Sequence, residues 1–191
     1  MMLRVADIFG RFPQLETEQL ILRKMRKDDA RDLYEYASDP DVSRHTLWNA
    51  HRSLLDSQRF LEAVIEQYKS KEVTNWGIEH KADRKFIGTC GFVYWNPDHR
   101  RAEIGYALSK SYWNQGIMSE AAHAVMQFGF KKMLLNRLEA RCNVENIGSE
   151  RVMQKIGMTY EGTIREQLLI RGKFEDVKLY SILRSEVSLE C

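Results

Sequence analysis

Two stretches of this chain place small polar residues where backbone amides could bind an anion. The first is SYWNQGIMSEAA at 111–122, in which Gly116 stands between a bulky aromatic stretch and residues that open a helix. Unpaired N–H groups and the positive end of the helix dipole point out of such a junction. Gly116 has no Cβ to keep a phosphate away from the main chain, and Ser119 can cap the helix or donate its hydroxyl. The stretch is consistent with an anion site that needs no lysine, although a lone glycine equally fits a tight turn into the helix.

The second stretch is CNVENIGSERVMQKIGM at 142–158, with Asn146 and Ser149 at and just inside the start of a short helix. Asn is a common N-cap, so capping alone explains Asn146 when it is considered by itself. The two stretches together indicate more. Two successive strands would each pass into a helix at the same edge of the sheet, and both helix N-termini would then face one cleft.

The strand before the first of these helices, AEIGYAL at 102–108, has an unusual centre. Alternation puts its residues on two faces, with Glu103, Gly105 and Ala107 on one and Ile104, Tyr106 and Leu108 on the other. A glycine in mid-strand indicates a bulge or the close approach of another backbone. If strand pairing opens there, main-chain amides become free to bind an extended ligand that carries amide groups of its own.

Periodicity predicts the elements that must position these residues. Residues 19–25 alternate as a strand, and a helix follows Asp28 and Asp29. A second helix is predicted where Ser53 and Asp56 form a capping pair. Three short segments between 75 and 109, rich in aromatic and β-branched residues, predict an antiparallel meander.

The rest of the chain continues this order without a linker or an internal repeat. We expect a helix from Ser119 to about Met133, a strand over 137–144, a short helix ending at Gly157 and a hairpin that turns at Gly172. The aromatic residues of the meander are expected mainly in the core, with one or two of them in the wall of the acceptor cleft; they are Trp76, Phe86, Phe92, Tyr94 and Trp95. The fold class that results is α+β, around one mixed and mostly antiparallel sheet flanked by helices.

Composition limits the functions that are compatible with this fold. A chain of 191 residues with 43% apolar content fits one domain, and 29 Lys and Arg against 27 Asp and Glu give a net charge of +2. That balance does not favour direct nucleic-acid or membrane binding. Cys90, Cys142 and Cys191 are far apart and odd in number, which favours a reducing compartment, and neither they nor the five histidines have metal-ligand spacing. With neither a membrane span nor a secretory signal, we expect a cytoplasmic protein that holds no metal.

Gly116 with its flanks, the strand AEIGYAL and the block NVENIGSERVMQKIGM together resemble the GNAT superfamily of acyl-CoA-dependent N-acetyltransferases. The tail and the opening LETEQLILRKMRKDDARDLYEYASDPDV are similar to the group that includes the ribosomal-protein N-terminal acetyltransferases and their spermidine-acetylating relatives. The resemblance runs from Leu15 to Val187, so residues 1–14 are an expected N-terminal extension and 15–191 the acetyltransferase domain. It implies a pair of splayed central strands, acetyl-CoA as co-substrate and a possible homodimer.

In that family a loop of the form Gln/Arg-x-x-Gly-x-Gly/Ala binds the pyrophosphate of coenzyme A. The frame falls here on residues of which only the central glycine matches, namely Trp113, Asn114, Gln115, Gly116, Ile117 and Met118. The resemblance implies contact mainly through the amides of Gln115, Gly116, Met118 and Ser119. Ile104, Tyr106 and Leu108 lie on the strand whose main chain would pair with the pantetheine arm.

The second block carries the remaining family roles. Asn146 resembles the Asn that bonds the pantetheine arm from the opposite side, and Ser149 matches a Ser near the thiol. Many family members use a Tyr farther along this helix as general acid, but Met153 occupies that place, which rules that mechanism out here. Lys155 could reach a phosphate, although a solvated helix charge is the commoner role.

The chemistry requires a neutral amine, because primary amines with pKa values of roughly 8 to 10.4 are mostly protonated at pH 7. Glu103 is the candidate base, directly or through a water, and the alternative is a carboxylate satisfied by Arg100, Arg101 or backbone donors. A thiolate leaving group needs little help, so Ser149 as hydrogen-bond donor is sufficient. Main-chain N–H groups would hold the oxyanion.

We therefore expect transfer of an acetyl group from acetyl-CoA to a primary amine in a ternary complex. The acceptor is a protein N-terminus, as in the ribosomal-protein group, or else a polyamine or another small amine. Four acidic residues near the expected cleft would suit any of these, namely Glu161, Glu166, Glu175 and Asp176. Two other classes stay open, an acyl-CoA-binding sensor without catalysis and a protein that contacts RNA through its small basic clusters.

Overall fold

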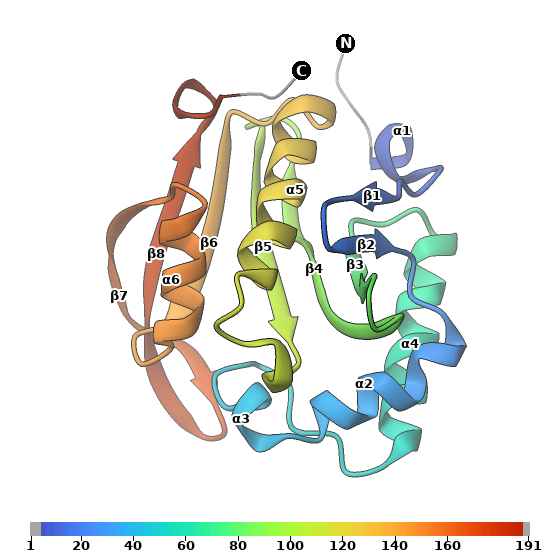
Figure 1. Cartoon of the computed structure of the whole chain (residues 1–191). Coiled ribbons are helices and arrows are strands. Elements are labelled where there is room, and N and C mark those ends of the chain that lie inside the picture. The colour runs from blue at the N-terminus through green and yellow to red at the C-terminus, as the bar shows by residue number, and fades with distance from the viewer. Residues whose placement is uncertain (1–4, 189–191) are drawn as a thin grey trace.

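The computed structural model describes residues 5–188, which form one eight-stranded sheet with helices against it (Figure 1). The order across the sheet is β1-β2-β3-β4-β5-β6-β8-β7. The strands are β1 (Leu15–Glu16), β2 (Leu20–Arg23), β3 (Asn75–His80), β4 (Lys85–Asn96), β5 (Arg101–Leu108), β6 (Arg137–Asn143), β7 (Thr159–Ile170) and β8 (Lys173–Leu183). All neighbours pair antiparallel except β5 and β6, which are parallel. The predicted mixed α+β fold is confirmed.

Six α-helices accompany the sheet within residues 5–188. They are α1 (Val5–Phe9), α2 (Ala30–Ala37), α3 (Pro40–Ser43), α4 (Leu54–Lys69), α5 (Ile117–Lys132) and α6 (Ile147–Lys155). The predicted capping pair is present at α4, where the Asp56 carboxylate accepts from the backbone N–H of Ser53 at 3.0 Å. Short α3 was not predicted, because four residues are too few to show a helical period.

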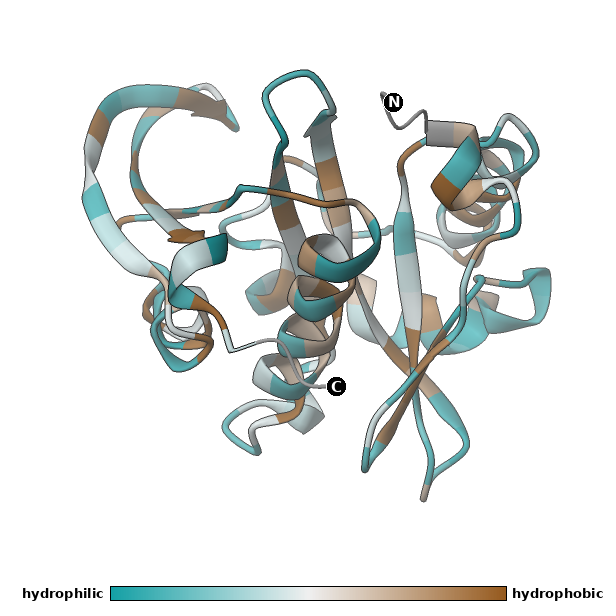
Figure 2. Cartoon of the chain, turned by 90° about the horizontal axis from the view of Figure 1, so that it is seen from above, coloured by the Kyte–Doolittle hydropathy of each residue, from teal (hydrophilic) through white to brown (hydrophobic). Residues whose placement is uncertain are grey.

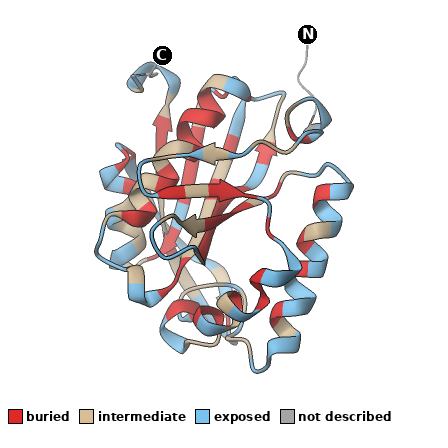
Figure 3. Cartoon of the chain, turned by 45° about the vertical axis from the view of Figure 1, so that its right-hand side comes forward, coloured by how far each residue is buried: buried red, intermediate tan, exposed pale blue. Residues whose placement is uncertain are grey.

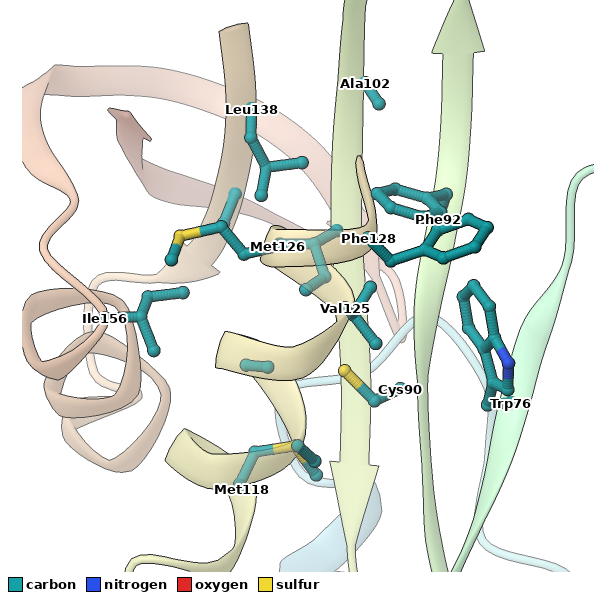
Figure 4. Packing of buried hydrophobic residues seen from close by; sticks show 14 of the residues in the cluster. Trp76, Cys90, Phe92, Ala102, Met118, Val125, Met126, Phe128, Leu138 and Ile156 are labelled. Carbon is teal, nitrogen blue, oxygen red and sulfur yellow. The ribbon is translucent and has the colours of Figure 1, made fainter. Parts of the chain in front are cut away.

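The main core lies between the sheet and helices α5 and α6 (Figure 4). Met118, Val125 and Met126 of α5 are buried against the strands, and Trp76 and Phe92 stand edge to face with ring centroids 6.0 Å apart. A second cluster lies under α2 and α4, whose buried residues follow one stripe while their other faces are exposed (Figure 3). Hydrophobic segments accordingly concentrate on the strands and on the inner sides of the helices (Figure 2).

The main core excludes one of the meander aromatics, Tyr94, and includes a residue of the N-terminal segment, Phe9. Tyr94, expected mainly in the core, is instead 43% exposed, because its ring lies over the Arg101 guanidinium on the other side of the sheet. Phe9 is only 2% exposed and packs in the main core, and the Trp76 indole donates to the carbonyl of Pro13 at 2.7 Å. Residues 9–13 therefore dock on the body of the protein.

The feature that shapes the functional region is the short pairing of β5 with β6. Only three parallel residue pairs connect them, the last being Glu103 with Glu139. Beyond that pair β5 continues to Leu108 beside β4, while β6 continues to Asn143 beside β8. The edge of β5 that faces β6 is therefore unpaired by any strand from Ile104 onward, as the splayed pair predicts.

The predicted irregularity near Gly105 is present, but it lies in the neighbouring strand. The register of β4 against β5 shifts between Phe92 and Tyr94, so the bulged residue is Val93. A Cβ at Gly105 would lie 2.7 Å from Cγ1 of Val93. The close neighbour of this glycine is therefore a side chain rather than another backbone.

Gly88 is a second glycine that the position of β5 requires. It pairs with Leu108, and a Cβ built on it would overlap the carbonyl oxygen of Ala107. Since that neighbour is backbone, only a shift of the strand end could relieve the overlap.

We expect Gly88→Ala to lower the free energy of unfolding by about 1–3 kcal/mol, because it forces β5 away from β4. Urea denaturation measures the change. The same replacement in α6, Gly148→Ala, has only an ordinary contact at 3.7 Å and should be neutral or stabilising by up to about 1 kcal/mol. Equal stability of Gly88→Ala and the unaltered chain would contradict this account of the strand spacing.

Candidate active site

A cavity of about 870 Å³ opens where β5 and β6 part. Its wall combines the end of β5, the first turns of α5 and α6, and the loop that follows α3. Of the residues predicted to contact the cofactor, the wall contains Tyr106, Leu108, Trp113, Asn114, Gly116, Met118, Ser119, Asn146 and Ser149. The two helix beginnings thus meet at one cavity, as their order in the sequence predicts.

Two predicted cofactor contacts lie outside the wall. Ile104 is 3% exposed and belongs to the main core. Gln115 turns its side chain back to donate to the carbonyl of Ser111 at 2.8 Å. Met153, in the position where a general-acid Tyr was considered, is also buried in the core.

The loop before α5 presents its backbone to the cavity. Asn114 and Gly116 have φ of +60° and +81°, and the Trp113 indole donates to the carbonyl of Leu108 at 2.9 Å. Gly116 is the N-cap, so Ser119 lies inside the first turn, and of the two roles considered for Ser119 the structure excludes capping. A Cβ at Gly116 would have no atom within 4 Å, which leaves open space above the first-turn amides. Those amides have no acceptor within the helix and can bind an anion.

The first turn of α6 is joined to β5 by side-chain hydrogen bonds. Oδ1 of Asn146 accepts from the backbone N–H of Ser149 at 3.1 Å, so Asn146 is the predicted N-cap. The Tyr106 hydroxyl reaches across from β5 and lies 3.0 Å from Oγ and 3.1 Å from the carbonyl oxygen of Ser149. Burial raises the pKa of Tyr106, with the hydrogen bond to Ser149 acting in the opposite direction.

Glu103 occupies the last paired position before the strands part, on the face of the sheet opposite α5 and α6. It does not line the cavity described above. Its carboxylate accepts from Arg141 at 2.8 Å, so its ion-pair partner is Arg141 rather than Arg100 or Arg101. Burial raises the pKa of Glu103, while Arg141 lowers it and Glu139 raises it further.

Several residues in the wall were not identified from the sequence, namely Arg44 and Arg151, which bring positive charge to the cavity, and His45 in the loop after α3. Lys155, considered as a residue that could reach a phosphate, also lies in the wall. Burial lowers the pKa of His45, and Arg44 adds to the effect, so the imidazole is neutral at pH 7. The sequence holds no spacing signal for this loop, because it reaches the site by tertiary contact only.

Two contacts hold the segment of α3 and the loop after it, which contributes residues to the cavity wall. Lys110, just after β5, pairs with Asp41 at 2.5 Å. Arg171, at the tip of the β7–β8 hairpin, donates to the carbonyl oxygens of Ser43 at 2.7 Å, Arg44 at 3.0 Å and Trp48 at 3.1 Å. The segment of α3 and the loop after it is thus attached both to Lys110, just after β5, and to the hairpin.

The four acidic residues expected near the cleft are not in the cavity wall. Glu161 binds Arg137 at 2.6 Å and Ser181, which places it at the start of β6, and its pKa is lowered to about 2 by Arg137 and Ser181. Glu175 binds Lys173 at 3.0 Å and Asn143 at 3.2 Å and is close enough to His45 to influence its pKa. Asp176 accepts from the backbone N–H of Glu166 at 2.8 Å.

Residues 5–188 contain no group of three His, Cys, Asp or Glu side chains that could hold a metal ion. In the same range, no helix has the length and apolar character that crossing a membrane requires. Cys90 and Cys142 are buried as free thiols, and Cys191 lies outside the described residues.

Comparison with known proteins agrees with this geometry. The family model for the acetyltransferase (GNAT) domain matches residues 19–159. The chain is 33% identical over 173 residues to the uncharacterized N-acetyltransferase YoaA of Bacillus subtilis, covering 91% of this chain and 98% of the relative. It is 32% identical over 97 residues to the ribosomal-protein-serine acetyltransferase of Escherichia coli, covering 51% of this chain and 54% of the relative.

Among solved structures, the acetyltransferase (GNAT family) from Bacillus anthracis superposes with a TM-score of 0.80 at 31% identity, covering 91% of this chain and all of that one. Its fold is therefore shared across nearly the full length of both chains. The parted strands, the two helix beginnings at one cavity and these matches lead to one conclusion: the chain belongs to the GNAT family of N-acetyltransferases.

Proposed function

We propose that this enzyme transfers the acetyl group of acetyl-CoA to a primary amine, and that the acceptor is a protein N-terminus such as that of a ribosomal protein. The observation that carries the proposal is the convergence of two helix N-termini on a cavity beside an unpaired strand edge. Free thiols at Cys90 and Cys142 support a cytoplasmic location.

The residues of the cavity fit acetyl-CoA part by part. The first turn of α5, open above Gly116, suits the pyrophosphate. Arg44, Arg151 and Lys155 add the positive charge that a ligand with several phosphates requires. The unpaired edge of β5 beyond Glu103 offers main-chain groups to the amides of pantetheine. Asn146 and Ser149 form the opposite wall.

Glu103 supports the proton transfer that the reaction needs. The raised pKa of Glu103 is closer to the pKa of an amine than the pKa of an ordinary glutamate is. This favours a role of Glu103 as general base. It lies at the point where the strands part, on the face opposite the helices. An acceptor on that face and a donor between the strands would meet at this position.

The choice of acceptor follows the relative from Escherichia coli, whose name gives a ribosomal-protein serine as its target. The match covers about half of each chain, so a small amine such as a polyamine is the second candidate. An acyl-CoA sensor without turnover is the third.

A panel of acceptors separates the three. The unaltered chain is incubated with acetyl-CoA and either ribosomal-protein N-terminal peptides, polyamines or aminoglycosides, and thiol release is measured together with the mass of the acetylated product. The proposal expects turnover with peptides that exceeds turnover with small amines. Preference for a small amine would overturn the acceptor, and CoA binding without turnover on any amine would favour the sensor.

We expect Glu103→Gln to lower kcat/KM at pH 7 by about a hundredfold or more, because the attacking amine loses its base. The loss should shrink as pH rises and the amine deprotonates without help. Since the base acts in its ionised form and its pKa is raised, activity of the unaltered enzyme should fall with decreasing pH at a higher pH than an ordinary carboxylate would give. Arg141→Gln, which removes a cation that lowers this pKa, should move the acid limb further upward.

His45→Gln is the matched comparison, because His45 lines the cavity and its neutral imidazole can accept a proton. It should retain the pH profile of the unaltered enzyme. If His45→Gln reproduces the loss and Glu103→Gln does not, His45 is the base instead.

The cations of α6 generate a separate prediction. The double variant Arg151→Gln/Lys155→Gln should raise KM for acetyl-CoA roughly tenfold with little change in kcat, because charged hydrogen bonds to phosphate contribute to binding. Lys132→Gln, an exposed lysine in the last turn of α5, is the control and should leave KM unchanged. An unaltered KM in the double variant would exclude phosphate contact by these two residues.

A further inference from the structure

The hydroxyl of Tyr106 has no assigned task in the reaction described so far, although this side chain connects β5 to the first turn of α6. It leaves β5, passes the cavity and ends on the first turn of α6. The family role of the general-acid Tyr belongs to another position, which Met153 fills here. The leaving thiolate therefore has Ser149 as its nearest expected donor, and Ser149 is in contact with Tyr106.

The hydroxyl proton of Tyr106 has two possible acceptors, both on Ser149. A phenol carries a single hydrogen, and both Oγ and the carbonyl oxygen of Ser149 lie within hydrogen-bond distance of the Tyr106 oxygen, at 3.0 and 3.1 Å. If Tyr106 donates to the carbonyl, its oxygen can accept the hydrogen of the Ser149 hydroxyl. If Tyr106 donates to Oγ, the Ser149 hydrogen is released to point into the cavity.

Burial keeps this phenol protonated. The pKa of Tyr106 is raised because the ring is removed from water, so the hydroxyl remains a donor across the working pH range of the enzyme. Its position is also fixed, since Asn146 holds the first turn of α6 through the Ser149 amide at 3.1 Å. Few degrees of freedom remain at the contact beyond rotation of the two hydroxyl hydrogens.

We propose that Tyr106 is a positioning residue that turns the Ser149 hydroxyl toward the sulfur of coenzyme A as negative charge develops there. The inference rests on the proposed function. The amine nitrogen forms a bond to the carbonyl carbon, the carbon–sulfur bond breaks, and its electron pair stays on sulfur. The amine proton passes to the base. Tyr106 donates to Oγ of Ser149, Ser149 donates to the thiolate, and both hydroxyls keep their protons.

The ionisation of the thiol of bound CoA tests this directly, without turnover. Ultraviolet absorbance of the thiolate is followed against pH with the full chain and CoA, and desulfo-CoA supplies the blank. In the unaltered chain the thiol pKa should fall below its reference of about 8.5, because the aligned donors favour the anion. Tyr106→Phe should raise it by about one unit, a tenfold loss in the ionisation constant.

Tyr180→Phe is the matched control. Tyr180 also donates to α6, through Glu150 at 2.7 Å, but it lies outside the cavity wall. This variant removes from β8 a hydroxyl that contacts the same helix, and it should leave the thiol pKa unchanged. An equal rise in Tyr180→Phe would mean that the effect is structural, and would overturn the assignment.

Ser149→Ala provides a second route that leaves Tyr106 intact. It should raise the thiol pKa at least as much as Tyr106→Phe, and adding Tyr106→Phe to it should have no further effect, because the phenol acts through the serine. Additive shifts would contradict this. An unchanged thiol pKa in Tyr106→Phe would overturn the role of Tyr106 alone, whereas failure of the unaltered chain to bind CoA would overturn the proposed function.

Discussion

The functional region depends on the interruption of one β-ladder. Three parallel pairs tie β5 to β6, and after Glu103 and Glu139 each strand continues beside a different neighbour. Unpaired backbone groups are costly when they are buried without partners, so a sheet normally avoids such an opening. Here the cavity lies at the opening, and the edge of β5 beyond Glu103 has no strand partner. The bulge at Val93 in β4, opposite the same part of β5, locally bends the strand that supports this edge.

The helices on either side of the opening both begin at the cavity, but with different N-cap residues. α5 begins at a glycine in the left-handed region, and α6 begins at an asparagine whose side chain binds its own helix. At α5 the first-turn amides have no partner within the helix, whereas at α6 the Ser149 amide is already bonded to Asn146. The titratable and hydroxyl side chains of this region lie on both faces of the sheet, with Glu103 on one face and Tyr106 beside Ser149 on the other.

Local signals in the sequence predicted strands β2 to β8, helices α2, α4, α5 and α6, and the capping at Ser53 and Asn146, because alternation and capping are properties of neighbouring residues. Helix α5 begins at Ile117, two residues earlier than predicted, since its N-cap is Gly116 in the left-handed region and not Ser119. The contacts of Arg171 and the position of His45 could not be predicted. Both depend on how a hairpin and a distant loop meet. Every residue has a backbone carbonyl, so the partners of Arg171 leave no signal in the sequence.

The segment of α3 and the loop after it is held beside the cavity by two different kinds of contact. Lys110 and Asp41 form a pair of full charges on the surface, which dissolved ions screen over a Debye length of about 8 Å at physiological ionic strength. Arg171 instead binds three neutral carbonyl groups at short range, where screening has less effect. Rising ionic strength therefore weakens the attachment of this loop to Lys110 more than its attachment to the hairpin. The two sides of one loop thus differ in their sensitivity to salt.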